Sequence, residues 1–153
     1  MEYVIVDIDG TLSIVGDRAK CLQQNPKNWD EFYDRCDEDK PNTKIVELVQ
    51  ALWYRHYDIV FCTGRRESVR AKTVKWLHEY NMGHINCVLG RRQTLLMRPD
   101  GDFRHDTKVK PELLEKVGIK LKDIAFVLED RSSMVKKWRE LGVTCLQVAE
   151  GDF

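Results

Sequence analysis

Apolar and polar residues alternate along the chain in blocks that predict strands and helices in turn. Continuous apolar runs predict buried strands at Tyr3–Ile8, Tyr57–Cys62, Asn86–Leu89, Ile124–Leu128 and Val143–Val148. Apolar stripes at helical spacing predict helices at Thr43–Arg55, Glu67–Tyr80, Pro111–Val117 and Ser132–Leu141. Strands that are apolar throughout and alternate with helices are typical of a parallel sheet covered on both faces. The pattern therefore predicts an α/β fold built on an open parallel sheet.

Two segments interrupt this alternation. The polar stretch Leu12–Asn42 lacks a clean strand, and its Trp29, Phe32 and Tyr33 lie at near-helical spacing, which predicts a small helical insert after the first strand. The stretch 91–110, "RRQTLLMRPDGDFRHDTKVK", breaks the rhythm, and its "PDGD" indicates a tight turn. We expect one domain over residues 1–153 with an insert at about 12–42.

Composition narrows the class of protein. The 153 residues are 42% hydrophobic, enough for one sizeable core, and their net charge of zero gives no overall attraction to nucleic acid. Five cysteines without a CxxC pair favour reduced thiols in the cytoplasm and argue against a zinc site. The start has no basic leader, and no run approaches the ~20 apolar residues of a membrane span. We expect no contact with a membrane.

Acidic and basic side chains gather where the predicted strands end. Asp7 and Asp9 end the first strand, and carboxyl ends of parallel strands meet at one sheet edge. Thr63-Gly64-Arg65 and Glu129-Asp130 end two further strands. Any one of these acids alone is an ordinary turn or cap residue, but four together would repel each other without a cation. Oxygen ligands without His or Cys indicate Mg²⁺.

The spacing of the first two acids suggests a division of roles. A strand period of two places Asp7 and Asp9 on one side, with Ile8 facing away. One carboxylate can then attack phosphorus and form an aspartyl-phosphate, while the other transfers protons. Gly10 allows a sharp turn and leaves space for a phosphate.

Four segments in order resemble the motifs of the haloacid dehalogenase (HAD) superfamily of phosphohydrolases: "DIDGT", "CTGR", "RHDTKVK" and "VLEDR". This resemblance implies a three-layer, Rossmann-like sheet with a cap insert after the first strand. Over nearly the whole chain, "MRPDGDFRHDTKVK" and "DRSSMVKKWRELGVTCLQVAEGDF" are similar to the phosphatase domain of phage polynucleotide kinase-phosphatases. Those domains remove 3′-phosphates from nucleic-acid ends, so a phage origin would imply the host cytoplasm.

The chain departs from that family in one respect. It has no GxxxxGK[ST] loop, so we do not expect phosphate transfer from ATP. We expect a stand-alone phosphatase or an excised half of a longer enzyme. A separate kinase or ligase is a possible partner, and the oligomeric state stays open.

The resemblance implies roles for the acids and for Thr63. Asp7 would be the nucleophile and a metal ligand, and Asp9 the general acid and base, with its backbone carbonyl on the metal. Asp130 would be the remaining protein ligand. Glu129 has a longer side chain than the usual aspartate, so it would bind the metal either directly or through water. Thr63 would hydrogen-bond the phosphoryl group.

The resemblance also implies a cation and a set of substrate-binding residues. The matched lysine is Lys110, with Lys108 as the alternative; a fixed cation there stabilises phosphoryl charge. Asp106 stands four residues before Lys110, as the motif requires. Arg18, Gly64 and Arg65 complete the expected substrate-binding positions. The alternative for Arg18 is a solvated surface charge.

Two features allow either a binding or a structural interpretation. Residues 91–110 contain six Lys or Arg and three Asp. This local excess of positive charge is equally compatible with contact to a nucleic-acid backbone and with an ordinary polar loop at the sheet edge. Trp29, Phe32 and Tyr33 either pack the insert down, which we favour, or stack a base. We expect a Mg²⁺-dependent phosphatase acting on nucleic-acid or nucleotide 3′-phosphates. The alternatives are a phosphatase for small metabolites or 5′-nucleotides and a non-catalytic nucleic-acid-binding module.

Overall fold

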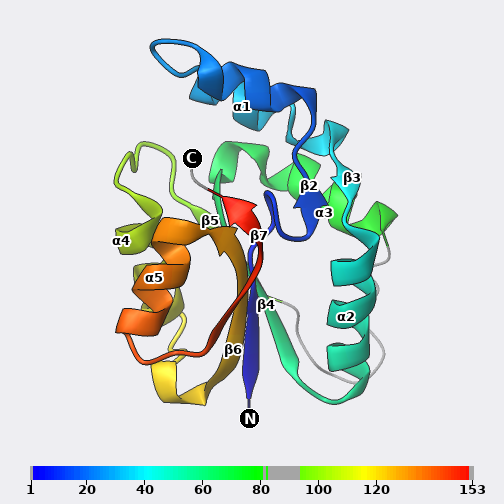
Figure 1. Ribbon diagram of the computed structural model, residues 1–153, viewed down its shortest axis with the longest axis vertical. Coiled ribbons are helices and arrows are strands. Elements are labelled where there is room, and N and C mark those ends of the chain that lie inside the picture. The colour runs from blue at the N-terminus through cyan, green and yellow to red at the C-terminus, as the bar shows by residue number, and fades with distance from the viewer. Residues whose placement is uncertain (1, 81, 83–93, 152–153) are drawn as a thin grey trace.

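The computed structural model describes residues 2–80, 82 and 94–151. Its main sheet has the strand order β5-β4-β1-β6-β7, with every neighbouring pair parallel (Figure 1). These strands are β1 (Tyr3–Val6), β4 (Asp58–Arg66), β5 (Thr94–Arg98), β6 (Ile124–Arg131) and β7 (Cys145–Gly151). The most buried strands lie in the middle, as their continuous apolar runs predict.

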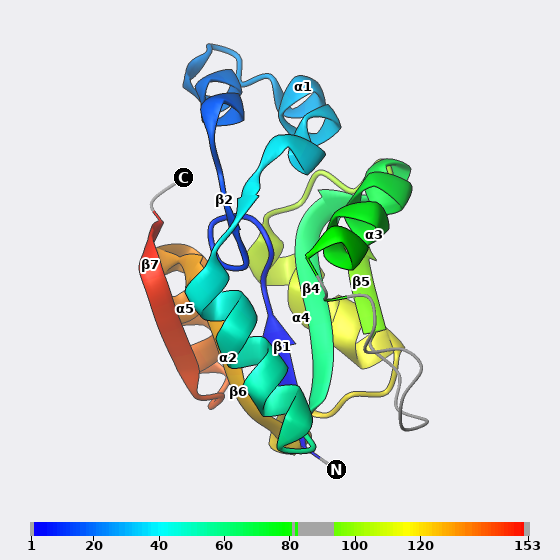
Figure 2. The ribbon, with the colours of Figure 1, turned by 90° about the vertical axis from the view of Figure 1, so that its right-hand side faces the viewer.

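Helices cover both faces of the sheet, which confirms the predicted three-layer α/β fold (Figures 1 and 2). They are α2 (Thr43–Tyr54) and α3 (Arg70–Glu79) on one face, and α4 (Asp106–Lys116) and α5 (Ser132–Glu140) on the other. None of the helices in the described ranges has the length and apolarity that crossing a membrane would require.

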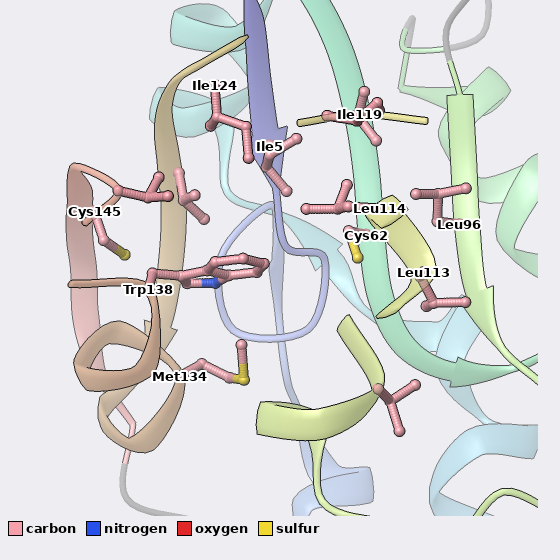
Figure 3. Close-up of a cluster of buried hydrophobic side chains, with 14 of the residues drawn as sticks. Ile5, Cys62, Leu96, Leu113, Leu114, Ile119, Ile124, Met134, Trp138 and Cys145 are labelled. Carbon is pink, nitrogen blue, oxygen red and sulfur yellow. The ribbon is translucent and has the colours of Figure 1, made fainter. Parts of the chain in front are cut away.

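Alternate residues of the central strands point to opposite faces of the sheet and belong to two separate hydrophobic cores. Val4 and Val6 of β1 pack with α2 and α3, whereas Ile5 packs with α4 and α5. Figure 3 shows the second core, in which Trp138 of α5 lies flat beside Met134 and faces the central strands. Helices therefore pack against both faces of the sheet, and this packing fixes the position of the carboxyl ends of its strands.

The 12–42 insert forms a small cap above the carboxyl ends of the strands (Figure 1). Its two short strands, β2 (Ser13–Ile14) and β3 (Lys40–Pro41), pair antiparallel and connect the cap to the sheet. Between them lie η1 (Asp17–Gln23), α1 (Trp29–Asp34) and η2 (Cys36–Glu38). The side chain of Asn28 accepts the backbone N–H of Glu31 and so caps α1. A small helical insert after the first strand is therefore confirmed.

Several predicted boundaries are wrong. β1 ends at Val6 instead of Ile8, because the backbone N–H groups of Thr11 and Ser13 both donate to the carbonyl of Ile8 and turn the chain. α4 begins at Asp106, five residues before Pro111, because the His105 side chain accepts the N–H of Thr107 and caps the helix.

A strand also lies where the sequence predicted none. β5 falls inside the stretch that broke the apolar rhythm. The apolar run of this strand is short and ends at a charged residue, Arg98, so the sequence does not read as a buried strand. In the structure the guanidinium of Arg98 is buried and bound by protein oxygens. The short strand predicted at Asn86–Leu89 lies outside the described residues.

Candidate active site

A polar pocket lies beneath the cap at the carboxyl ends of β1, β4 and β6. The pairing register shifts between Thr63 and Arg66 in β4, and between Glu129 and Arg131 in β6. Such irregularities redirect side chains at a strand end. The pocket is lined by Asp7, Asp9, Trp29, Phe32, Tyr33, Gly64, Asp106, Lys110, Glu129, Asp130 and Arg131.

Lys110 of α4 joins two acids in the floor of this pocket. Its Nζ donates to Asp7 Oδ1 at 2.7 Å and to Glu129 Oε2 at 2.8 Å, and all three side chains are buried. Burial alone would lower the pKa of Lys110, but the carboxylates of Asp7 and Glu129 raise it well above its ordinary value. The ammonium therefore stays charged. Lys108, by contrast, is exposed on the outside of α4.

Three buried carboxylates face this single ammonium. Asp7, Glu129 and Asp130 each offer an oxygen, and these oxygens lie within 4.8 Å of one another. Burial and repulsion from Glu129 raise the pKa of Asp7 to about 7, although Lys110 opposes the rise. Burial and repulsion from Asp7 raise the pKa of Asp130 to about 7. This excess of negative charge, carried by oxygen atoms alone, fits a hard divalent cation such as Mg²⁺.

Glu129 differs from the other two acids in its partners. One of its oxygens accepts from Lys110, and the other accepts the backbone N–H groups of Asp130 and Arg131, each at 3.2 Å. Protein donors thus engage both oxygens. This arrangement favours the water-mediated alternative for Glu129 over direct ligation.

Two glycines enclose Asp130. A Cβ at Gly10 would lie 2.3 Å from Asp130 Oδ2, and a Cβ at Gly151 would lie 2.7 Å from the same atom. Gly10 also has φ +86°, a conformation that favours glycine. Thr11 Oγ1 donates to the Asp130 carboxylate at 3.2 Å. The chain therefore leaves Asp130 almost no freedom to move toward β1 or β7.

Asp9 belongs to a second cluster, which it shares with two buried arginines. Its Oδ1 accepts from Arg18 Nη2 at 2.6 Å and from Arg65 Nη2 at 2.7 Å. Burial would raise the pKa of Asp9, but Arg65 and Arg18 lower it to about 2. Asp39 holds Arg18 from the other side, accepting from Nε at 2.8 Å and from Nη2 at 2.6 Å. The arginines thus hold Asp9 as an anion.

The surface-charge alternative for Arg18 is wrong. Its side chain is 1% exposed, and its guanidinium lies 4.2 Å from the ring centroid of Phe32. Arg65 is equally enclosed, at 0% exposure. Both arginines contact the site by donating hydrogen bonds to Asp9.

Of the remaining predicted residues, Gly64 and Asp106 line the pocket, and Thr63 of β4 lies next to Gly64 in the chain. Thr63 is fully buried, and its Oγ1 accepts the backbone N–H of Arg65 at 3.2 Å. A Cβ at Gly64 would lie 2.8 Å from Asp106 Oδ1, so only glycine fits there without a shift. The Asp106 carboxylate is bound by Arg98 and, at 2.8 Å, by Arg131. Asp106 is therefore a fixed anion at the side of the pocket.

Comparison with known families decides what kind of enzyme carries this site. The family model for the polynucleotide kinase PNKP phosphatase domain matches residues 1–153. The chain belongs to this family. It is a phosphatase domain of the HAD superfamily, as the four sequence motifs predicted.

The domain is also similar to several solved structures. It matches "Structure of Pnkp1/Rnl/Hen1 complex" at 30% identity with a TM-score of 0.78, and "Structure of the Pnkp1/Rnl/Hen1 RNA repair complex" at 31% with 0.80. Each match covers 99% of this chain but only 47% and 43% of the other chains, so the domain spans less than half their length. A predicted phosphatase from Clostridium acetobutylicum shares the fold at 14% identity, with a TM-score of 0.71 over 95% of this chain and 83% of its own.

The fold thus brings most of the predicted residues together in two adjacent groups, one around Lys110 and one around Asp9, while Thr63, Gly64 and Asp106 lie beside them. Sequence reasoning missed the residues that hold these groups in place: Thr11, Asp39, Arg98, Arg131 and Gly151. Thr11, Arg98, Arg131 and Gly151 lie inside the quoted segments, and that position was the signal that could have singled them out. Asp39 lies in the polar insert outside those segments, and only the folded chain reveals its partner.

Proposed function

We propose that this domain is a Mg²⁺-dependent phosphomonoesterase that removes 3′-phosphates from nucleic-acid ends or nucleotides. The observation that carries the proposal is the contact between Asp7 and Lys110 inside a buried acidic group. It supplies a carboxylate to attack phosphorus and a fixed cation to receive the charge that develops on the phosphoryl oxygens.

In the first step, an oxygen of Asp7 attacks phosphorus and forms an aspartyl-phosphate, and the bond to the substrate's ester oxygen breaks. Lys110 stabilises the charge on the phosphoryl group, and the buried Thr63 hydroxyl is the further donor we assign to it. The leaving oxygen needs a proton, which we assign to the protonated form of Asp9, the form that the second step regenerates. Because Arg18 and Arg65 favour the anion of Asp9, this proton transfer is the demanding one.

In the second step, water attacks the aspartyl-phosphate and Asp7 is regenerated. The ionised Asp9 suits this step directly, since it is ready to accept the proton of the water. Asp7 and Asp130 are the residues we assign as metal ligands, with Glu129 acting through water. A bound Mg²⁺ would neutralise the acidic group and the phosphoryl oxygens.

The family and the chain lengths support a proposal about partners. The neighbours at 30% and 31% identity are chains of Pnkp1/Rnl/Hen1 complexes, and this chain matches less than half of each. We infer that the phosphatase works beside a kinase or ligase, in the same assembly or on the same substrate. Its four described cysteines are free and buried, which suits a cytoplasmic setting.

A substrate panel tests the proposed function. We would measure phosphate release with Mg²⁺ from a 3′-phosphorylated oligonucleotide, a 3′-mononucleotide and a 5′-mononucleotide. The two 3′-phosphates should have the higher kcat/KM, and Asp7→Asn should abolish release without unfolding the protein. Asp17→Asn, at an exposed acid of the cap, is the matched control. Preference for the 5′-mononucleotide would contradict the substrate assignment, and oligonucleotide binding without hydrolysis would favour a binding module.

A further inference from the structure

A second cavity, which we call the aromatic cavity, opens beside the site pocket. Its volume is about 220 Å³, and it shares Trp29, Tyr33, Asp106 and Arg131 with that pocket. The rest of its lining is Arg66, Arg98, Asp102, Phe103, Arg104 and His105. A molecule whose phosphate lies near Asp7 would therefore extend directly into this second cavity.

Aromatic rings come to this cavity from two elements that are distant in the sequence. Trp29 and Tyr33 of α1 stack on each other, with ring centroids 5.8 Å apart and planes 24° apart. Phe103 lies in the connection between β5 and α4 and is 80% exposed. The Arg66 guanidinium lies 5.3 Å from the Tyr33 ring and 5.5 Å from the Phe103 ring. Phe32, in contrast, is buried and packs the cap down. Tyr33 is partly buried and also packs against the small cluster of Cys36, Val69 and Met97, so the packing interpretation holds for Phe32 and for one side of Tyr33.

The charges of the lining also suit an anionic chain. Among the described lining residues are four arginines and two aspartates. Each of these arginines is paired with an acid, which fixes its position. Arg98 and Arg131 bind Asp106, Arg104 binds Asp102 and Glu112, and Arg66 binds the exposed Asp30. Aromatic rings beside fixed guanidinium groups are the combination that binds unpaired nucleotides, because bases stack on the rings while cations face the backbone.

We propose that the aromatic cavity binds the nucleobase of the nucleotide whose phosphate is removed, stacked on Phe103 and facing the Trp29–Tyr33 pair. The proposal rests on the proposed function, because it takes the scissile phosphate to lie at Asp7. At about 220 Å³ the cavity is smaller than the roughly 300–1,000 Å³ of pockets that enclose drug-sized ligands, so it suits one ring system. The terminal nucleotide therefore enters unpaired, and any of the four bases is accepted.

Removing the ring of Phe103, and separately removing the base, tests this proposal. The substrates are a 3′-phosphorylated oligonucleotide and the same strand ending in an abasic 3′-phosphate. Phe103→Ala should lower kcat/KM on the first about 5- to 150-fold, the range for one base–aromatic stack, mainly through KM. It should leave the abasic substrate unchanged, and Phe103→Tyr should retain the wild-type values. Tyr54→Ala, at a tyrosine of α2 that is 79% exposed, is the matched control.

Binding measured without turnover separates this proposal from the proposed function. In Asp7→Asn protein with Mg²⁺, fluorescence anisotropy of both labelled strands gives Kd before and after Phe103→Ala. Weaker binding of the base-bearing strand alone supports the cavity, even if the wild-type protein releases no 3′-phosphate. An equal loss on both strands, or no loss on either, would overturn it.

Discussion

The guanidinium of Arg65 donates two hydrogen bonds to a single carboxylate oxygen of Asp9, from Nε at 3.0 Å and from Nη2 at 2.7 Å. With Arg18 on the same oxygen, the pair lowers the pKa of Asp9 to about 2. Asp9 is therefore ionised near neutral pH, in the form that can accept a proton, and it rarely carries a proton to donate. The importance of Asp9 for the first step should therefore depend on whether the leaving group of the substrate needs a proton.

Asp9→Asn should therefore act differently on two phosphate esters. On a 3′-phosphorylated oligonucleotide, whose sugar oxygen needs a proton to leave, we expect kcat to fall about 10²- to 10⁴-fold. On p-nitrophenyl phosphate the leaving phenolate needs no proton, so formation of the aspartyl-phosphate should be nearly unaffected. Burst kinetics measure that step, and an equal loss of burst rate on both esters would contradict the acid role.

Arg18→Met should destabilise the protein by about 3 kcal/mol, because it leaves the buried carboxylate of Asp39 and the partly buried carboxylate of Asp9 with less compensation. Urea unfolding measures the change. Lys20→Met is the matched control, since Lys20 lies in the same short helix and is 75% exposed, and we expect it to stay within about 0.5 kcal/mol. Equal stability of both variants would mean that the cluster around Asp9 contributes nothing to the fold.

Lys110→Met should lower kcat at least about 10²-fold, because it removes the fixed cation beside Asp7. Lys108→Met should leave kcat unchanged, since Lys108 lies exposed on the same helix. Initial rates on a 3′-mononucleotide check both, and circular dichroism checks that the variants fold. The reverse order of effects would reassign the motif lysine.

Removing the metal should stop phosphate release, and Mg²⁺ should restore it after EDTA. Mg²⁺ should also stabilise the wild-type protein against heat, by about 2.7 kcal/mol at a hundredfold excess over Kd. Asp130→Asn should lose most of this stabilisation, whereas Asp17→Asn should retain it. Full activity in EDTA would be incompatible with the proposed cation.

The thiol of Cys62 should make stability depend on alkaline pH. Burial raises its pKa from 9 to about 12, so the folded protein keeps a proton that the unfolded chain loses above pH 9. The free energy of unfolding should thus fall as pH rises through this window, by about 1.4 kcal/mol between pH 8 and 10 from this group. The comparison is with Cys62→Ala, in which this part of the pH dependence should vanish.

Local sequence patterns predicted those parts of the site that lie at strand ends. Asp7, Thr63 and Asp130 follow apolar runs that predict parallel strands. Because the carboxyl ends of parallel strands lie at one edge of the sheet, the sequence predicted that these residues lie close together. The start of α4 was misplaced because Pro111 resembles a first-turn residue, whereas a histidine cap at His105 sets the true start.

Other features depend on contacts across the fold, which no local pattern encodes. The burial of Arg18 follows from Asp39, a residue of the polar insert that gives no signal of its own. β5 was missed because a charged residue, Arg98, takes a buried position that pairs it with Asp106. Buried ion pairs of this kind look like surface residues when each partner is read alone.

The cap joins the sheet through only two short paired strands, which would make it easy to exchange for another cap during evolution. Arg18 and Asp39, however, belong to this insert: Arg18 binds Asp9, which follows β1, and Asp39 holds Arg18 in place. An exchanged cap without them would leave Arg65 as the only described guanidinium bound to Asp9. Under the proposed function, exchanging the cap would therefore alter proton transfer by Asp9 as well as the surroundings of the substrate.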